Sequence, residues 1–195
     1  MISISNISSD DYQQVIKLIY HTDNYIYPSM CENDYGYFEK IMFHNLNTNS
    51  IFSYKNVIAA KENNEIAGIV LAFSNEQSLP PMPQNGEFEV KKCYEKVLTE
   101  FFQELIKSIK PNCLYINNLC VDKQYQNKGV GNALLQYILT NTKEKFISLD
   151  CLENNNPAIA LYKKCGFKVT NRYLVDSGNS EEKIYCLKFE KSLDK

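Results

Sequence analysis

The fold is decided by the stretch Gln126-Asn127-Lys128-Gly129-Val130-Gly131, which joins a strand-like segment to an amphipathic helix. Residues 113–121 upstream read as a strand, and residues 130–138 downstream place their apolar side chains on one helical face. The loop is therefore predicted to be a helix entrance, where free N–H groups and the positive end of the helix dipole favour an anion. Its two glycines let a ligand approach the main chain closely. We expect a phosphate-bearing cofactor here.

Two common phosphate-binding loops do not fit these residues. A Walker-type loop needs G-x-x-x-x-G-K-[ST], which this chain does not contain, and a dinucleotide fingerprint needs a small residue where Leu134 stands. What remains is the pattern Q-x-x-G-x-G. Residues 121–135 resemble the strand-loop-helix of the GNAT superfamily of N-acetyltransferases, whose signature is [QR]-x-x-G-x-[GA].

A second segment makes the resemblance more specific. Residues 155–167, Asn155-Asn156-Pro157-Ala158-Ile159-Ala160-Leu161-Tyr162-Lys163-Lys164-Cys165-Gly166-Phe167, resemble the family segment N-x-x-A-x-x-L-Y-x-x-x-G-F. They follow a further strand-like segment, 146–151, so the order of the elements agrees too. We expect Asn156 to cap a short helix, Pro157 to open it and Gly166 to end it in a left-handed conformation. The first 110 residues resemble the family only in the order of their elements.

Composition narrows the class of protein. With 195 residues, 44% hydrophobic and 23% charged, the chain is expected to form one soluble globular domain. A net charge of −2 gives no reason to expect a nucleic acid partner. Seven cysteines without a C-x-x-C pair suggest buried thiols in a reducing compartment. Neither a signal peptide nor a membrane-spanning run is seen, so we expect a cytoplasmic protein that does not enter a membrane.

The remaining elements follow from periodicity and from residues that break regular structure. Pro111 is expected to end a helix, and Asn63-Asn64 to form the tight turn of a hairpin. The expected order is a strand near 2–7, a helix from 8–11 to 19, a loop over 21–35, a helix from 33 or 34 to 45, strands at 57–63 and 65–72, irregular chain at 79–86, a helix over 87–109, and a final hairpin of 167–176 and 183–190.

The resemblance implies an α/β (α+β) fold of the GNAT type. This is a single N-acetyltransferase domain, 1–195, with a mixed and mostly antiparallel central sheet that is flanked by helices and splayed at its two central strands. Segment 79–112 would be an inserted loop and helix, and 113–167 the acyl-CoA-binding core.

The resemblance also implies acetyl-CoA as the co-substrate and no metal. The main chain of Leu119 and Val121 would pair with the pantetheine arm, while Asn155 and Tyr162 would flank the thioester. Main-chain N–H groups from residue 127 to residue 132 would hold the pyrophosphate. The expected cofactor-binding residues are Leu119, Val121, Gln126, Asn127, Lys128, Gly129, Val130, Gly131, Asn132, Asn155 and Tyr162.

Tyr162 is the expected catalytic residue, because in many family members the equivalent phenol protonates the departing thiolate. The general base stays open, since residues 113–121 contain no carboxylate. The candidates are Asp150, Glu153, Glu87 and Glu89, each of which we expect to be a surface or loop carboxylate rather than a base. A water molecule relayed by Asn117, Asn118 or backbone carbonyls is an equal alternative. Cys120 is read as a buried thiol rather than a nucleophile.

We therefore expect an acetyl-CoA-dependent N-acetyltransferase that moves an acetyl group to a primary amine by direct attack in a ternary complex. The acceptor would be a small molecule or a peptide, because tyrosines and phenylalanines crowd residues 20–43, near the acceptor end in relatives. The alternative is a non-catalytic sensor or regulatory module that binds acyl-CoA on the same fold. The oligomeric state is open between monomer and homodimer.

Overall fold

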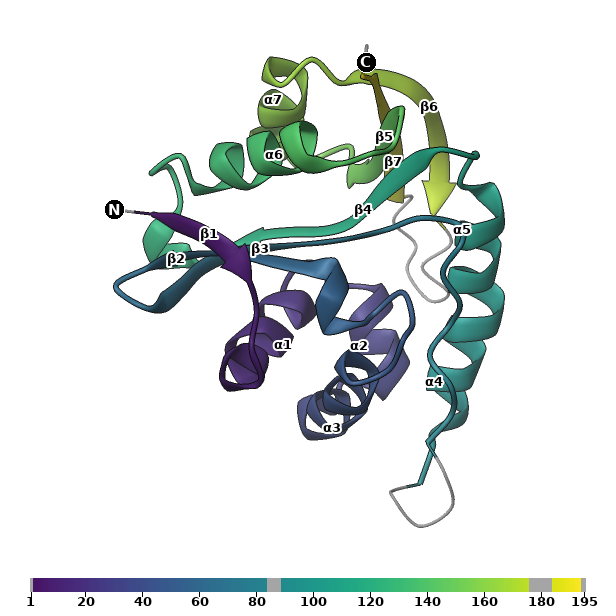
Figure 1. The fold of residues 1–195 in the computed structure, drawn as a ribbon. Helices are drawn as coiled ribbons and strands as arrows, with labels where there is room; N and C mark the ends of the chain where they lie inside the picture. Colours follow the sequence, from purple (N-terminus) through teal and green to yellow (C-terminus); the bar gives the residue numbers. More distant parts are fainter. Residues whose placement is uncertain (1, 84–88, 176–183, 194–195) are drawn as a thin grey trace.

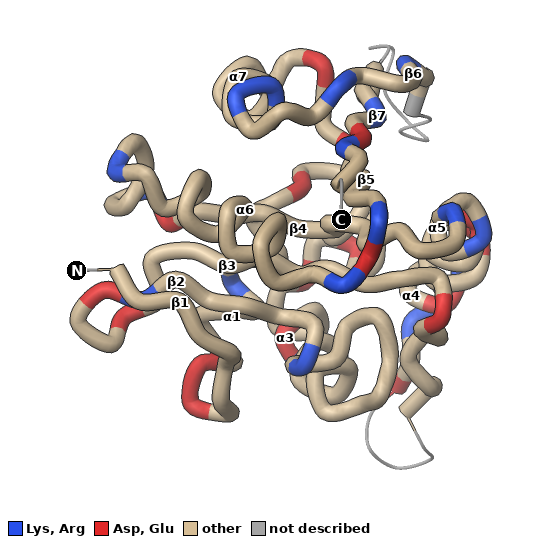
Figure 2. Tube along the Cα trace, turned by 45° about the horizontal axis from the view of Figure 1, so that its top comes forward, with Lys and Arg blue, Asp and Glu red and all other residues tan. Residues whose placement is uncertain are grey.

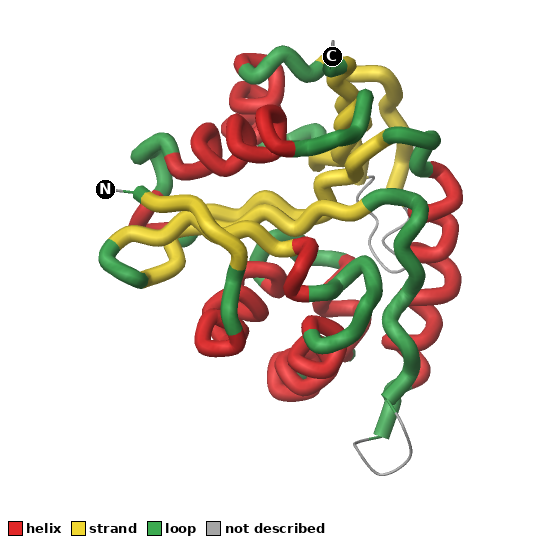
Figure 3. Tube along the Cα trace, in the orientation of Figure 1, coloured by secondary structure: helices red, strands yellow, loops and turns green. Residues whose placement is uncertain are grey.

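A seven-stranded mixed sheet forms the middle layer of the protein (Figures 1 and 3). The computed structural model describes residues 2–83, 89–175 and 184–193. The strand order is β1-β2-β3-β4-β5-β7-β6, and every neighbouring pair is antiparallel except β4 and β5. This confirms the expected fold class. The strands are β1 Ser3–Asn6, β2 Val57–Glu62, β3 Glu65–Phe73, β4 Cys113–Val121, β5 Phe146–Leu152, β6 Lys168–Val175 and β7 Ile184–Ser192.

Helices cover both faces of the sheet (Figure 1). On one face α6 and α7 enclose a core with the side chains of β4 and β5, and on the other the N-terminal helices and α4 to α5 enclose a second core. Each apolar side chain buried there contributes about 1.5–3 kcal/mol. The helices are α1 Tyr12–Tyr20, α2 Ile26–Cys31, α3 Tyr35–Leu46, α4 Lys92–Lys96, α5 Gln103–Ser108, α6 Val130–Asn141 and α7 Asn156–Lys164, with a π-helical turn, Val97–Phe102, between α4 and α5.

The two central strands part halfway along β4. They pair from Cys113 opposite Phe146 as far as Ile116 opposite Leu149, whereas β4 continues to Val121. On its other side β4 stays paired with β3, and the register shifts there by one residue at Asn117. A bulge of this kind bends a strand and increases its twist. The bend begins where the pairing of β4 with β5 ends, so the expected splay between the two strands is present.

Most of the predicted elements are found, with one clear error in the N-terminal part. Residues 21–35 were expected to be a loop, but Ile26–Cys31 form α2. The tight turn at Asn63-Asn64 is confirmed, since both residues are left-handed with φ of 53° and 66°. Strands β6 and β7 pair as a hairpin. The predicted turn 177–180 lies outside the described residues.

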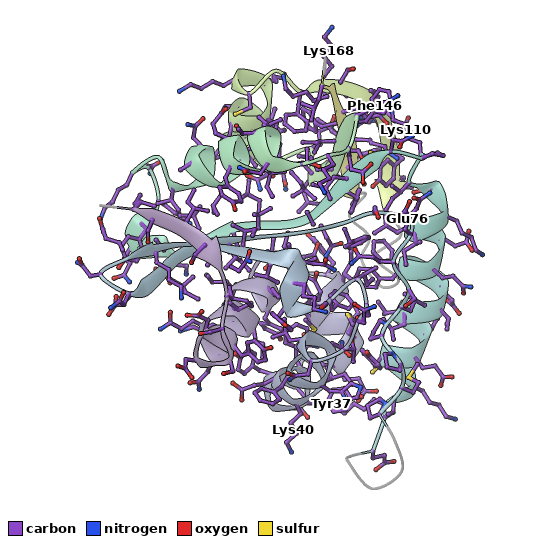
Figure 4. All side chains as sticks on the ribbon, viewed as in Figure 1. Tyr37, Lys40, Glu76, Lys110, Phe146 and Lys168 are labelled. Carbon is purple, nitrogen blue, oxygen red and sulfur yellow. The ribbon has the colours of Figure 1, made fainter. Side chains whose placement is uncertain are left out.

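The segment 79–112 is tied to the body of the protein at both ends of its helical part. Near the start, the N–H of Lys91 donates to the phenol oxygen of Tyr37 at 2.9 Å. Beyond the end, Lys110 forms a 2.7 Å ion pair with Glu190 and lies 4.0 Å from the ring centroid of Phe146 (Figure 4). Both basic and acidic residues occur along the helical part (Figure 2). The predicted helix over 87–109 is observed from residue 92 to residue 108, and 84–88 lie outside the described residues.

Candidate functional site

The loop before α6 presents main-chain N–H groups, as the sequence predicts. Gly129 is the residue before the helix and is left-handed, with φ of 85°. The first hydrogen bond of the helix runs from the N–H of Ala133 to the carbonyl of Gly129 at 3.0 Å. The N–H groups of residues 130–132 precede that bond and have no acceptor within the helix. Together with the helix dipole they form a site suited to a phosphate group.

The two glycines of the loop have different roles. A Cβ built on Gly129 would meet nothing within 4 Å, so the space above it is open to a ligand and only its φ requires glycine. A Cβ on Gly131 would lie 3.2 Å from the side chain of Leu161 and 3.5 Å from that of Val121. Close packing of α6 against α7 and β4 therefore explains Gly131. Open space on the Cβ side is present only at Gly129, and a ligand contact at either glycine stays a prediction.

The far half of β4 has a main-chain edge that faces the splay. Asp122, the residue after β4, donates its N–H to the carbonyl of Ala67 in β3 at 3.0 Å. Because main-chain groups alternate along a strand, those of Leu119 and Val121 point away from β3, toward the side where β5 is no longer paired. The side-chain amide of Gln126 donates to the carbonyl of Val121 at 3.3 Å. The remaining groups on this edge can pair with an extended ligand.

Lys128 and Asn155 occupy surface positions beside these groups. The ammonium of Lys128 lies 5.3 Å from the ring centroid of Tyr125, within cation–π range. Asn155 is the N-cap of α7, and its side chain accepts a hydrogen bond from the N–H of Ala158 at 3.3 Å. The sequence prediction gave this cap to Asn156, which is the first helical residue instead. Gly166 ends α7 with φ of 84°, as expected.

Tyr162 lies on the α6 and α7 side of the sheet and is buried, with 7% of its surface exposed. Its ring centroid is 5.5 Å from that of Phe189 and 6.1 Å from that of Phe167. No described residue forms a hydrogen bond with its phenol. Burial raises the pKa of Tyr162, and the nearby Cys151 adds to the effect. The phenol thus stays protonated at neutral pH and can donate its proton.

Asp150 is the first residue of β5 beyond the paired segment, so it stands where the strands part. One carboxylate oxygen, Oδ2, accepts a hydrogen bond from the phenol of Tyr115 at 2.9 Å. The other, Oδ1, is buried and has no partner among the described residues. Burial raises the pKa of Asp150, while hydrogen bonds from Tyr115 and Tyr173 and the charge of Lys188 act in the opposite direction. A carboxylate with a raised pKa and an unpaired oxygen is suited to accept a proton.

The other predicted base candidates lack these properties. Glu153 is exposed and forms two hydrogen bonds to the guanidinium of Arg172, which lower its pKa. Glu89 is exposed on the chain before α4. Glu87 lies outside the described residues. The expectation that Asp150 is a surface or loop carboxylate is therefore wrong, and it is the candidate that the geometry favours.

A hydrogen-bond network on the bulge of β4 was missed from the sequence. The side-chain amide of Asn117 donates to the phenol oxygen of Tyr27 and to Oδ1 of Asn118, both at 2.8 Å. The same Asn118 oxygen accepts from the phenol of Tyr27 at 2.9 Å. Tyr27 belongs to α2, the helix that the sequence analysis did not predict. The only sequence signal for Tyr27 was its place in a segment rich in aromatic residues, and nothing distinguished it from the other aromatic residues there.

Comparison with known proteins agrees with this geometry. A model of the acetyltransferase (GNAT) family matches residues 16–167, which include the α6 loop, both central strands and α7. The chain belongs to the GNAT family. The predicted resemblance is thus confirmed.

Solved structures share the fold of this GNAT protein. An N-acetyltransferase from Staphylococcus aureus Mu50 superposes with a TM-score of 0.65 at 19% identity, covering 97% of this chain and all of the other. The ribosomal-protein-S18-alanine N-acetyltransferase from Escherichia coli gives a TM-score of 0.62 at 15% identity, covering 100% of this chain and 96% of the other.

Sequence relatives match shorter segments of this GNAT protein. An N-alpha-acetyltransferase of Sulfurisphaera tokodaii is 38% identical over 69 residues, which cover 32% of this chain and 41% of the relative. A probable spermine N(1)-acetyltransferase of Bacillus subtilis subsp. natto is 37% identical over 71 residues, 34% of this chain and 47% of the relative. The mouse cysteine-rich protein 2-binding protein is 30% identical over 93 residues, 48% of this chain and 12% of the relative. The chain therefore spans less than half of the length of these relatives.

The cysteines of the GNAT protein near the splay are poor nucleophiles. Burial raises the pKa of the Cys120 thiol, and it raises that of Cys151 to about 11. Both thiols are therefore protonated at neutral pH, which agrees with the prediction for Cys120.

The described part of the GNAT protein has no group of three His, Cys, Asp or Glu side chains placed to hold a metal ion. Nor does any described helix combine the length and the apolar character of a membrane span.

Proposed function

We propose that this protein is an acetyl-CoA-dependent N-acetyltransferase and that its acceptor is the α-amino group of a peptide. The main support is the splay itself, because the free edge of β4, the N–H groups at the start of α6 and the carboxylate of Asp150 all lie next to the part of β4 that is not paired with β5. The free edge of β4 can pair with the extended, amide-containing pantetheine arm of the co-substrate, and the N–H groups at the start of α6 can bind its pyrophosphate. Open space above Gly129 leaves room for the pyrophosphate.

Asp150 and Tyr162 take complementary roles in the proposed reaction. Oδ1 of Asp150 accepts a proton from the acceptor ammonium, directly or through one water molecule, and the free amine attacks the thioester carbonyl. The N–H of Val121 faces the splay and stabilises the negative charge that develops on the carbonyl oxygen. As the carbon–sulfur bond breaks, Tyr162 donates its proton to the thiolate. The nitrogen loses its second proton as the amide forms, and this proton restores the Tyr162 phenol through solvent. The products are the acetylated amine, coenzyme A and one proton released to solvent.

The α-amino group is favoured because it is the easier amine to deprotonate. An α-amino group has a pKa of about 8, whereas a lysine-like amine has one of about 10.4. Loss of a proton at pH 7 therefore costs about 1.4 kcal/mol for the first and about 4.6 kcal/mol for the second. A single carboxylate such as Asp150 is better suited to deprotonate an α-amino group, because this costs less free energy than deprotonating a lysine-like amine. The uncharged amides of Asn117 and Asn118 at the splay also suit a peptide more than a polycation.

The relatives support an amine acceptor and differ in its kind. Two of those named above are an N-alpha-acetyltransferase and a probable spermine N(1)-acetyltransferase. A further relative, from Escherichia coli, is a peptidyl-lysine N-acetyltransferase. The experiment must therefore distinguish a terminal amine, a lysine side chain and a polyamine.

Amine-dependent release of coenzyme A tests the proposal. The acceptors are a peptide library with free N-termini, the same library blocked at the N-terminus but containing lysine, and a polyamine. We expect thiol release and acetylated product with the free N-termini, and at least tenfold less with the other two. Release with a blocked peptide or a polyamine alone would contradict the choice of acceptor. Tight acetyl-CoA binding without turnover on any amine would indicate the binding module instead.

A further inference from the structure

The two oxygen atoms of Asp150 are held differently. Oδ2 accepts the 2.9 Å hydrogen bond from the phenol of Tyr115, whereas Oδ1 is buried without a partner among the described residues. A buried acceptor that lacks a donor costs about 1–3 kcal/mol, and buried polar groups in native proteins are nearly always paired. Oδ1 of Asp150 lies at the point where two strands part. If the acceptor amine donates a hydrogen bond to this oxygen, its lack of a partner is explained.

Tyr115 is fixed firmly enough to direct this arrangement. It stands on β4 within the paired segment, opposite Ser148 of β5 and one residue before the last pair. It is buried, and its ring centroid is 5.6 Å from that of Phe73. Burial and the charge of Asp150 raise the pKa of Tyr115 well above its usual value, so the phenol acts as a donor at any working pH.

Groups from the neighbouring strands also face Asp150. The phenol of Tyr173 on β6 and the ammonium of Lys188, opposite Asp150 on β7, both lower the pKa of Asp150 and so favour the ionised carboxylate. Cys186 of β7 and Cys151 of β5 are near enough for the charge of Asp150 to raise their pKa further, after the larger effect of burial. Tyr115 is the donor with the well-defined 2.9 Å hydrogen bond.

We propose that Tyr115 is a positioning residue for the transfer reaction: by holding Oδ2 of Asp150, it leaves Oδ1 as the atom that takes the proton of the acceptor amine. This rests on the proposed function. When Oδ1 accepts a proton from the ammonium nitrogen, Asp150 becomes neutral and the hydrogen bond from Tyr115 weakens. The proton passes to solvent after the product leaves. Tyr115 itself neither gains nor loses a proton.

The pH dependence of kcat/KM separates this role from simple packing. A hydrogen bond from Tyr115 favours the ionised carboxylate, so its loss raises the pKa of Asp150 and moves the acidic limb of the profile to higher pH. We expect Tyr115→Phe to shift that limb upward by about one pH unit, which is the effect of losing one hydrogen bond to a charged group. We also expect kcat at pH 7 to fall more than the affinity for acetyl-CoA.

Tyr94→Phe is the matched control, because it removes another buried phenol whose hydrogen bond, to Asn45, lies in the core beside α3. It should leave the acidic limb in place. The double variant Asp150→Asn with Tyr115→Phe should have the same pH profile as Asp150→Asn alone. This comparison holds even if a substitution lowers the stability of the protein. An unmoved limb in Tyr115→Phe, or an equal shift in Tyr94→Phe, would overturn the positioning role. Wild-type protein that releases no thiol with any amine would refute the proposed function instead.

Discussion

The role of Tyr162 can be tested with little disturbance to the fold, because its phenol bonds to no described residue while its ring packs against Phe167 and Phe189. Tyr162→Phe keeps those ring contacts and removes only the proton donor. We expect kcat to fall by about 10²-fold, the size of a general acid contribution, with the Kd for acetyl-CoA changed less than threefold. Steady-state kinetics and equilibrium binding measure the two effects. A kcat equal to that of the wild type would remove Tyr162 from the mechanism.

Substitution of Asp150 by asparagine should lower activity and raise stability. Because its pKa is raised in the folded protein, the folded state binds more protons than the unfolded state above the unfolded pKa, and the free energy of unfolding falls as pH rises through the folded pKa. Asp150→Asn removes a buried charge with an unpaired oxygen. We expect Tm at pH 7 to rise by about 2–4 °C, which corresponds to about 1 kcal/mol in a chain of this size.

The same substitution should lower kcat by about 10²-fold or more, because the proton acceptor is lost. The gain in Tm should vanish below the unfolded pKa of about 3.9, where Asp150 is neutral in both states. Thermal melts of the wild type and the variant across pH check the stability effect. A variant that is less stable at pH 7 and fully active would contradict both expectations.

At the scale of elements, the start of α6 depends on one left-handed residue. Gly129 has φ of 85°, and a Cβ there would meet no other atom, so substitution acts through backbone strain alone. Gly129→Ala should cost about 1–2 kcal/mol and weaken acetyl-CoA binding as the loop shifts. Gly129→Asn is the matched variant, because asparagine tolerates the left-handed region, and it should lose less than half as much. Equal losses in the two variants would mean that φ is not the reason for the glycine.

How far the sequence predicts an element depends on whether its signals are local. The loop and start of α6, the Asn63-Asn64 turn and the Gly166 end of α7 were predictable, because each depends on a few adjacent residues. Helix α2 was not, since it has six residues, includes Pro28 and has no capping hydrogen bond from the Tyr25 side chain. Instead, Asp23, two residues earlier, accepts hydrogen bonds from the N–H groups at its start.

The geometry of the α6 loop was predictable from the sequence, whereas the surroundings of Asp150 were not. The phosphate loop and Tyr162 lie in contiguous motifs. The importance of Asp150 arises from Tyr115, 35 residues earlier, and from the end of the β4–β5 pairing at Ile116 and Leu149. Such contacts depend on the tertiary pairing of strands and have no local pattern, which is why the four base candidates could not be ranked from the sequence.

At the scale of the whole molecule, the open splay predicts that ligand binding stabilises the fold. A ligand that binds only the folded state at 100 times its Kd adds about 2.7 kcal/mol to the free energy of unfolding. For a chain of this length we expect coenzyme A to raise Tm by about 5–10 °C. Gly129→Ala should show a smaller rise at the same concentration. Thermal unfolding with increasing coenzyme A checks this, and a Tm that does not move in the wild type would contradict it.

Hydrogen exchange of individual amides with and without saturating coenzyme A tests most directly where the ligand is held. We predict that the ligand slows exchange at residues 127–132 before and in the first turn of α6, and at Leu119 and Val121 on the free edge of β4. Amides deep in the sheet, such as those of β2 and β3, should change little. Binding that leaves 127–132 and the edge of β4 unprotected, or that protects another surface instead, would refute the proposed binding site.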